Sequence, residues 1–161
     1  MEEKDVLERL KEKGIPFERT EHPAVYTIEE MEAEALPYPA DVCKNLFLRD
    51  AKGKRHFLVV MEKNKRADLD RLHTLLGTSK LSFASEDRLM RYLGLTKGAV
   101  TPLGILNDHD HAVEVVLDRD LEKHPRLGVH PCVNTATVWL AFSDLRRLIE
   151  ENGNRICLLD L

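Results

Sequence analysis

The sequence lacks the features that would mark several common classes of protein. It has three cysteines, Cys43, Cys132 and Cys157, without CxxC spacing, which argues against a disulfide scaffold and suits a reducing compartment. No apolar run approaches the roughly 20 residues that span a bilayer. The opening residues, Met-Glu-Glu-Lys-Asp, are too acidic for a signal peptide. We therefore expect a cytoplasmic protein with no membrane partner.

A phosphate-binding loop is also missing. Gly94, Gly98 and Gly104 fit neither GxGxxG nor GxxxxGK[ST], so nucleotide-dependent chemistry has no support and we expect no cofactor. The net charge of -4 does not by itself indicate a nucleic-acid binder. Basic residues do cluster at 52–55 and 63–66, and charge gathered on one face matters more to a phosphate backbone than the total. Solvated loop lysines are the simpler interpretation of these clusters.

What the sequence contains is an interleaved series of helix and strand patterns. Helices are expected over 5–13, 28–35, 68–76, 85–93 and 144–151, with Thr27 and Ser143 as N-caps. Strands are expected over 17–22, 46–48, 56–61, 103–106, 112–117, 135–141 and 155–159. The patterns do not alternate as regular βαβ units, and no linker or repeat divides the chain. We therefore expect residues 1–161 to form a single compact α+β domain with a mixed sheet.

Lys44 occupies an unusual place at the start of the apolar run 46–48. That run is expected to form a hairpin with 56–61 through a turn at 51–54. A lysine at the end of a core strand either extends its ammonium group past the sheet edge or holds a charge where a ligand arrives. The residue alone fits both interpretations.

Two other groups of residues have chemical potential but little support. His109 and His111 form an HxH pair that could suit zinc. No third ligand follows at a suitable spacing, so we expect a solvated turn and no metal. Cys132 lies close to His130 in the sequence, but a catalytic cysteine and histidine usually meet from distant parts of a chain. A buried thiol is the better interpretation of Cys132.

Three segments, taken together, change the interpretation of Lys44. They are Lys44-Asn45-Leu-Phe-Leu48, Gly98-Ala-Val-Thr-Pro102-Leu-Gly104, and Val129-His130-Pro131 with Asn134-Thr-Ala-Thr137. In this order and at this separation they resemble the YbaK/ProX-like family of aminoacyl-tRNA deacylases, relatives of the editing insertion domain of bacterial prolyl-tRNA synthetase. The runs KNLFLRDAKGKRHFLVV and HPCVNTATVWL are most similar to the freestanding deacylases that clear alanine mischarged onto proline tRNA. The resemblance covers nearly the whole chain.

The resemblance implies a fold and a set of site residues. The fold is a mixed, curved β-sheet with helices packed around it. Lys44 matches the family's essential lysine, and Gly98 and Pro102 match its GxxxP loop, so these three are the implied catalytic residues. The implied substrate-binding residues are Asn45, Ala99, Val100, Thr101, His130 and Asn134. Arg49 and Lys80 match basic positions suited to the acceptor stem of the tRNA.

The implied reaction is hydrolysis of the ester between an amino acid and the terminal ribose of proline tRNA. A synthetase pocket that accepts proline cannot strongly reject alanine, because missing methylenes cost only about 1–3 kcal/mol of binding. With no triad, metal or reactive thiol evident, we expect attack by water ordered by the loop backbone and the ribose hydroxyl. Lys44 would hold the terminal phosphate or ribose, because lysine is a poor base near neutrality.

Three alternatives stay open on the sequence alone. The chain could be a non-catalytic module that binds aminoacyl-tRNA or a synthetase. It could be a deacylase for cysteine or serine, or an esterase or amidase for small molecules. Prolyl-tRNA synthetase and an elongation factor are candidate transient partners.

Overall fold

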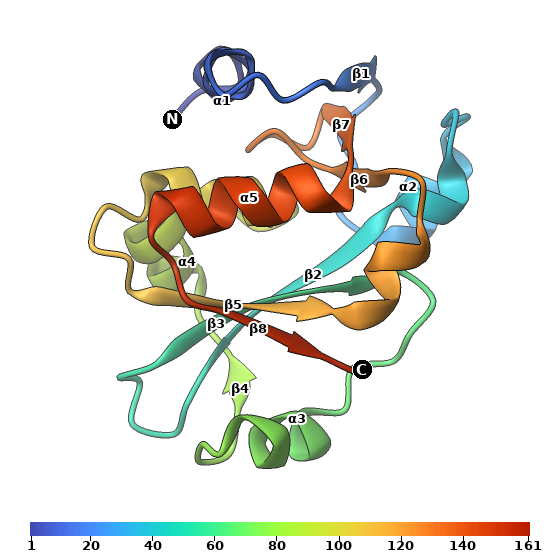
Figure 1. Ribbon diagram of the computed structural model, residues 1–161. Helices are drawn as coiled ribbons and strands as arrows, with labels where there is room; N and C mark the ends of the chain where they lie inside the picture. The colour runs from blue at the N-terminus through green and yellow to red at the C-terminus, as the bar shows by residue number, and fades with distance from the viewer.

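The computed structural model describes residues 1–161, which fold into five α-helices, three short 3-10 helices and eight strands (Figure 1). The α-helices are α1 (Glu3–Glu12), α2 (Ile28–Ala33), α3 (Leu69–Leu76), α4 (Glu86–Leu93) and α5 (Phe142–Asn152). The 3-10 helices are η1 (Pro39–Asp41), η2 (Pro102–Asn107) and η3 (Arg119–Lys123). The strands are β1 (Glu18–Glu21), β2 (Cys43–Arg49), β3 (His56–Glu62), β4 (Ser82–Phe83), β5 (Val113–Asp118), β6 (Leu127–Val129), β7 (Ala136–Leu140) and β8 (Ile156–Leu159).

The strands divide between two sheets. The larger has five strands in the order β4-β2-β3-β5-β8 and is mixed, because β4, β2 and β3 run antiparallel while β3, β5 and β8 run parallel. The smaller is an antiparallel sheet in the order β1-β7-β6. A single bridge between Val42 and Gly128 joins the two sheets just before β2. The predicted α+β class, with a mixed sheet and helices around it, is confirmed.

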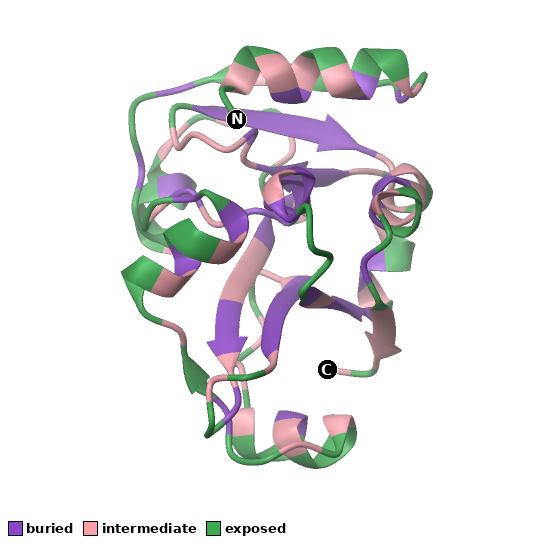
Figure 2. Ribbon diagram, turned by 90° about the vertical axis from the view of Figure 1, so that its left-hand side faces the viewer, coloured by how far each residue is buried: buried purple, intermediate pink, exposed green.

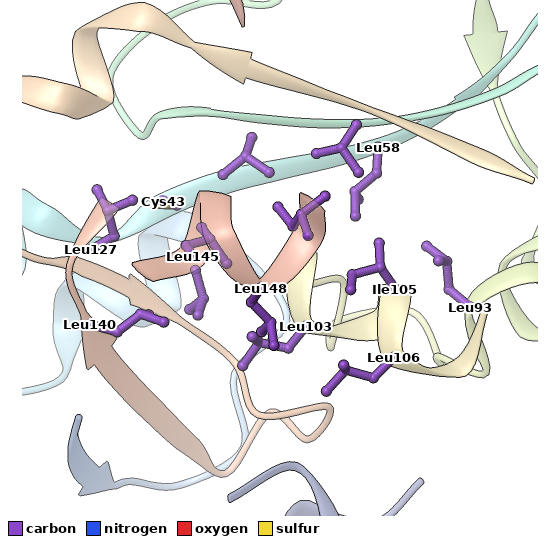
Figure 3. Close-up of a cluster of buried hydrophobic side chains, with 14 of the residues drawn as sticks. Cys43, Leu58, Leu93, Leu103, Ile105, Leu106, Leu127, Leu140, Leu145 and Leu148 are labelled. Atoms are coloured by element: carbon purple, nitrogen blue, oxygen red, sulfur yellow. The ribbon is translucent and has the colours of Figure 1, made fainter. Parts of the chain in front are cut away.

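Helix α5 lies between the two sheets and carries much of the core (Figure 1). Its Leu145, Leu148 and Ile149 belong to one buried cluster with side chains of both sheets, and Figure 3 shows several of them meeting. The opposite face of the larger sheet is covered by α3, through Leu72. Because both faces of β3 are covered, its residues 57–61 are apolar without alternation. Figure 2 shows the strands largely buried and the helices exposed on their outer sides.

The predicted helix ends are mostly confirmed by local geometry. Gly77, Gly94 and Gly153 each follow a helix in the left-handed conformation, which glycine adopts without steric cost. The side chain of Thr27 accepts a hydrogen bond from the N–H of Glu30 and so caps α2. Helix α5 differs from the prediction. It begins at Phe142 with Ala141 as N-cap, so Ser143 lies inside its first turn.

The predicted strand at 103–106 is wrong. These residues form the 3-10 helix η2, buried on all sides. When every face of a short segment is buried, its apolar residues show neither the helical nor the strand period. The sequence pattern of such a run therefore cannot distinguish a helix from a strand. The strand predicted at 112–117 does form, as β5, and it pairs in parallel with β3.

Strand β2 is longer than predicted, which changes the setting of Lys44. It begins at Cys43 and pairs with β3 along its whole length, so Lys44 lies within the strand rather than before it. Strands β4 and β6 were not predicted, because two or three residues are too few to show a period.

Candidate active site

A cavity of about 250 Å³ opens where the beginning of β2, helix α2 and the loop at Gly98 meet the smaller sheet. Figure 1 shows α2 beside the beginning of β2. The residues that line the cavity come from distant parts of the chain: Val25, Tyr26, Thr27, Ile28, Met31, Val42, Cys43, Lys44, Asn45, Leu46, Gly98, Val100, Gly128, Val129, His130 and Thr137. Five of the predicted site residues are among them, namely Lys44, Asn45, Gly98, Val100 and His130.

Lys44 is held in place by backbone. Its Nζ donates to the carbonyl of Lys65 at 3.0 Å, which leaves two of its three N–H bonds for a ligand. Lys65 is itself anchored, because its Nζ lies 2.9 Å from Asp118 and 2.6 Å from Asp120. The cavity wall contains no carboxylate, so Lys44 carries the only full charge on it when His130 is neutral. The site is therefore suited to an anionic group such as a phosphate.

Asn45 brings unpaired polar groups to the cavity. Its side-chain Oδ1 is the one buried side-chain polar atom of the protein without a hydrogen-bond partner, a state that costs about 1–3 kcal/mol unless a ligand satisfies it.

The backbone of Asn45 is unpaired as well. The carbonyl of Phe47 points away from β3, since it accepts from the N–H of Ala84, and backbone groups of alternate residues point the same way. The N–H and carbonyl of Asn45 therefore face the open edge of β2, which β4 pairs only at 48–49.

His130 stays neutral and presents a lone pair. Burial lowers the pKa of His130 below its usual value. Its Nδ1 donates to the carbonyl of Ala136 at 3.0 Å, so Nε2 carries no proton in the neutral ring and can accept a hydrogen bond. Next to it, the hydroxyl of Thr137 is paired with Nε2 of His22 at 2.9 Å. His130 lies on the cavity wall, and its contact with the substrate stays a prediction.

The GxxxP loop contributes to the cavity through only part of its length. Gly98 and Val100 line the cavity, whereas Ala99, Thr101 and Pro102 are buried and do not line it. Thr101 accepts from the N–H of Leu103 and caps η2, so these three residues hold the loop in place. Gly98 has φ +90, a conformation that L side chains rarely adopt.

Asn134 does not reach the cavity. Its Nδ2 donates to the carbonyl of Val25 at 2.9 Å, so it fixes the segment that leads into α2. Arg49 and Lys80 are also outside. Arg49 lies at the far end of β2, about 16 Å from Lys44 at 3.3 Å per strand residue, and its side chain donates to the carbonyls of Asp50 and Ala51. Lys80 lies just before β4, which pairs with that end of β2.

The basic clusters seen in the sequence are partly neutralised. Lys63 pairs with Glu32 and Lys65 with Asp118, while Arg55 makes two hydrogen bonds of 2.9 Å to Glu114. Lys52 and Lys54 of the β2–β3 turn make no ion pair. These pairings leave less free positive charge for a nucleic acid than the sequence suggests.

Sequence reasoning missed several wall residues. The position of Thr137 could have been found from the strand pattern. Val138 faces the main core, so Thr137 shares the opposite face of β7 with Trp139. Tyr26 and Met31 had no such signal, since Tyr26 lies in the loop before α2 and the helix itself is too short to show which of its residues face a cavity.

The thiols are unsuited to nucleophilic attack. Burial raises the pKa of the Cys132 thiol to about 11, and burial also raises the pKa of Cys43, which lines the cavity, far above its usual range. Both are protonated at neutral pH, and the thiolate is the reactive form. His109 and His111 are exposed after η2, and no cluster of three metal-binding side chains includes them.

The family of this chain follows from its sequence relatives. Residues 22–148 match the model of the aminoacyl-tRNA editing domain. The chain belongs to this family. The resemblance inferred from the sequence is therefore confirmed.

Several relatives cover nearly the whole chain, among them the following two. It is 49% identical over 156 residues to the prolyl-tRNA editing protein ProX of Acetoanaerobium sticklandii, covering 97% of this chain and 95% of the relative. It is 38% identical over 158 residues to the prolyl-tRNA synthetase associated domain-containing protein 1 of Danio rerio, covering 97% and 85%.

A solved structure shows the same fold. The crystal structure of a candidate trans-editing enzyme for prolyl tRNA synthetase superposes with a TM-score of 0.71 at 23% identity, covering 98% of this chain and 95% of that one. At this identity the likeness concerns the fold alone. Within the chain, no helix has the length and apolar character needed to cross a membrane.

Proposed function

We propose that this aminoacyl-tRNA editing enzyme removes alanine mischarged onto proline tRNA. Its activity class, deacylation of aminoacyl-tRNA, follows from the family; the amino acid, the tRNA and the residue roles are the proposal. The observation that carries it is the convergence of Lys44, Asn45, Gly98 and His130 on one small cavity that holds a single full charge and no reactive thiol.

The size of the cavity supports a small amino acid. Pockets for drug-sized ligands usually measure about 300–1,000 Å³, and this one is smaller, at about 250 Å³. Apolar side chains such as Val100, Val129 and Met31 form much of its wall. We propose that the stretch of this wall that meets the side chain of the amino acid admits a methyl group and excludes a pyrrolidine ring by steric overlap. Serine and cysteine differ from alanine by one atom, so their relative rates are part of the test.

The chemistry proposed for the site needs no covalent intermediate. Water adds to the ester carbonyl, the bond from that carbon to the ribose oxygen breaks, and the proton of the water passes to the ribose oxygen. The N–H of Asn45 at the open strand edge supplies a donor for the negative charge that develops on the carbonyl oxygen. Nε2 of His130 accepts from the ammonium group of the amino acid. The ribose hydroxyl of the substrate helps to order the water.

Lys44 acts in this proposal by position. Its ammonium group, anchored on the Lys65 carbonyl, has two N–H bonds left for the terminal phosphate or ribose. A charge-assisted hydrogen bond of this kind is roughly twice as strong as a neutral one. Lys44 therefore fixes the terminal nucleotide so that its ester lies in the cavity.

The rest of the tRNA would run along the larger sheet. We propose that Arg49 and Lys80, at the far end of β2, contact the acceptor stem upstream of the terminal nucleotide. We also propose that residues 1–161 work as one editing domain, since a single buried cluster draws on α1 and α5 alike. A cytoplasmic location and transient contact with prolyl-tRNA synthetase or an elongation factor are proposed from the nature of the substrate.

The decisive experiment measures release of labelled alanine, serine, cysteine and proline from charged proline tRNA. We expect the wild type to release alanine fastest and Lys44→Ala to release none. Lys44→Arg should restore little of the lost activity, because the larger, planar guanidinium group does not fit a site that binds a single ammonium group. Lys11→Ala, which removes an exposed lysine of α1 without an ion pair, is the matched control. Full turnover by Lys44→Ala would refute the role of Lys44, and binding without release by the wild type would indicate a non-catalytic module.

A further inference from the structure

Tyr26 is an exposed aromatic residue at the mouth of the cavity. It is 64% exposed, the highest value among the large apolar and aromatic side chains that are exposed, and it lines the cavity just before α2. Its hydroxyl group makes no hydrogen bond within the protein. A ring in such a place contributes little to the core, so its position calls for another explanation.

The ring is seated against the GxxxP loop. A Cβ placed on Gly98 would come within 2.6 Å of Cδ1 of Tyr26, so the bare backbone of Gly98 forms the surface on which the ring rests. This contact adds a second reason for glycine at position 98, beyond its φ of +90. The loop and the ring therefore form one continuous wall at the mouth of the cavity.

The backbone beneath the ring is held by several hydrogen bonds. The N–H of Tyr26 donates to Glu30 at 2.8 Å, and the N–H of Val25 donates to the carbonyl of Asn134 at 3.3 Å. The side chain of Asn134 donates in return to the carbonyl of Val25 at 2.9 Å. An exposed ring on a fixed backbone loses little further entropy when a ligand stacks on it. This arrangement also gives Asn134 a role at the site although it does not reach the cavity.

We propose that Tyr26 is the stacking platform for the terminal base of the tRNA, an adenine. The inference rests on the proposed function, which places the aminoacyl ester in the cavity. The base attached to the same ribose must then lie at the cavity mouth. The ring of Tyr26 is the only aromatic side chain on the cavity wall apart from the imidazole of His130. Aromatic residues commonly bind unpaired bases in this way.

Stacking predicts a specific kinetic pattern. Loss of one base–aromatic stack weakens binding by roughly tenfold to a hundredfold. Because Tyr26 does not touch the ester, Tyr26→Leu should raise KM by about that factor and leave kcat within about twofold. Tyr26→Phe should behave as the wild type, because it keeps the ring and loses only an unpaired hydroxyl.

A fluorescence experiment tests the stack directly. Proline tRNA carries 2-aminopurine, which is quenched when it stacks, in place of the terminal adenine, and alanine is attached through an amide that cannot be hydrolysed. We expect the wild type and Tyr26→Phe to quench the probe on binding and Tyr26→Leu to leave it bright at saturating protein. Leucine keeps an apolar cover over Gly98, so a purely structural role would survive this change. Phe83→Leu is the matched control, since Phe83 is 62% exposed on β4 and away from the cavity.

The outcomes separate this inference from the proposed function. Equal quenching and equal KM for Tyr26→Leu and the wild type would overturn the stacking role. A fall in kcat with unchanged KM would overturn it too, because it would place Tyr26 in the chemical step. If the wild type released no alanine from charged proline tRNA, the proposed function would fail, whereas the quenching comparison would still decide whether Tyr26 stacks on a terminal base.

Discussion

Replacement of Lys65 by methionine should reduce both stability and activity, although Lys65 is not on the cavity wall. Its ammonium group lies 2.9 Å from the carboxylate of Asp118, which has no exposed surface. Removing one partner of a buried ion pair costs about 3–5 kcal/mol. We expect a loss of stability of about 3 kcal/mol, the lower end of that range. The side chain of Lys65 is 21% exposed, and Asp118 still accepts hydrogen bonds from the N–H groups of Glu62 and Asp120.

The effect on activity would pass through Lys44. The Lys65 carbonyl that holds Lys44 belongs to a turn closed by the N–H of Lys65 on the carbonyl of Glu62. When the turn loosens, Lys44 regains side-chain freedom worth up to about 2 kcal/mol. Since 1.4 kcal/mol is about a factor of ten, kcat/KM should fall about tenfold to thirtyfold.

The assay compares urea unfolding and deacylation for Lys65→Met and Lys63→Met. Lys63 is a nearby lysine that pairs with Glu32, whose side chain is 49% exposed. Loss of this ion pair should therefore reduce the stability by no more than about 1 kcal/mol. Lys65→Arg should recover part of the stability by renewing the pair with Asp118. Equal unfolding midpoints for the two methionine variants would refute the reasoning, as would full activity of Lys65→Met.

Two further predictions concern specificity and pH. His130→Ala should enlarge the cavity and reduce the ratio of the rate of alanine release to that of proline release about tenfold or more. An unchanged ratio would show that His130 is not part of the wall that excludes proline. For His124, burial opposes the charge, but hydrogen bonds to Asp41 and Glu62 outweigh it and raise the pKa. Its stabilising effect, about 2 kcal/mol, should therefore be complete below the ordinary pKa of about 6.5 and disappear as pH rises through the raised value. Thermal unfolding at pH 5.5 and 9 should show the wild type losing its advantage over His124→Gln at the higher pH, and an equal difference at both pH values would contradict this.

Much of the fold could be predicted from the sequence where periodicity and end signals coincide. Helices α3 and α4 follow this rule, with Asp68 and Ser85 as caps and glycines at their ends. The hairpin of β2 and β3 was found because two apolar runs flank a polar turn. The sequence could not distinguish helix from strand for 103–106, because total burial removes the period that separates them.

The candidate site was only partly predictable, and for a different reason. Lys44, Asn45 and His130 stand in segments that resemble the family, so the resemblance placed them. Tyr26 comes from a segment without such a signature, and Thr137, which ends the resembling segment 134–137, was not assigned to the site. The fold of the segment before α2 and of β7 brings both residues to the cavity. Asn134 was assigned to the substrate, but its amide serves the protein backbone instead, which sequence spacing alone cannot show.

The open edge of β2 can also pair with a strand of another protein molecule. A strand with free N–H and carbonyl groups can pair with a strand of another chain and start aggregation or dimerisation. Here the edge must stay open for the substrate, so it cannot be covered by a further strand. Lys44 occupies this open stretch, and a charged side chain on an edge, lysine above all, disfavours such pairing. The lysine that we assign to the substrate would thus also keep the strand from joining a neighbouring molecule.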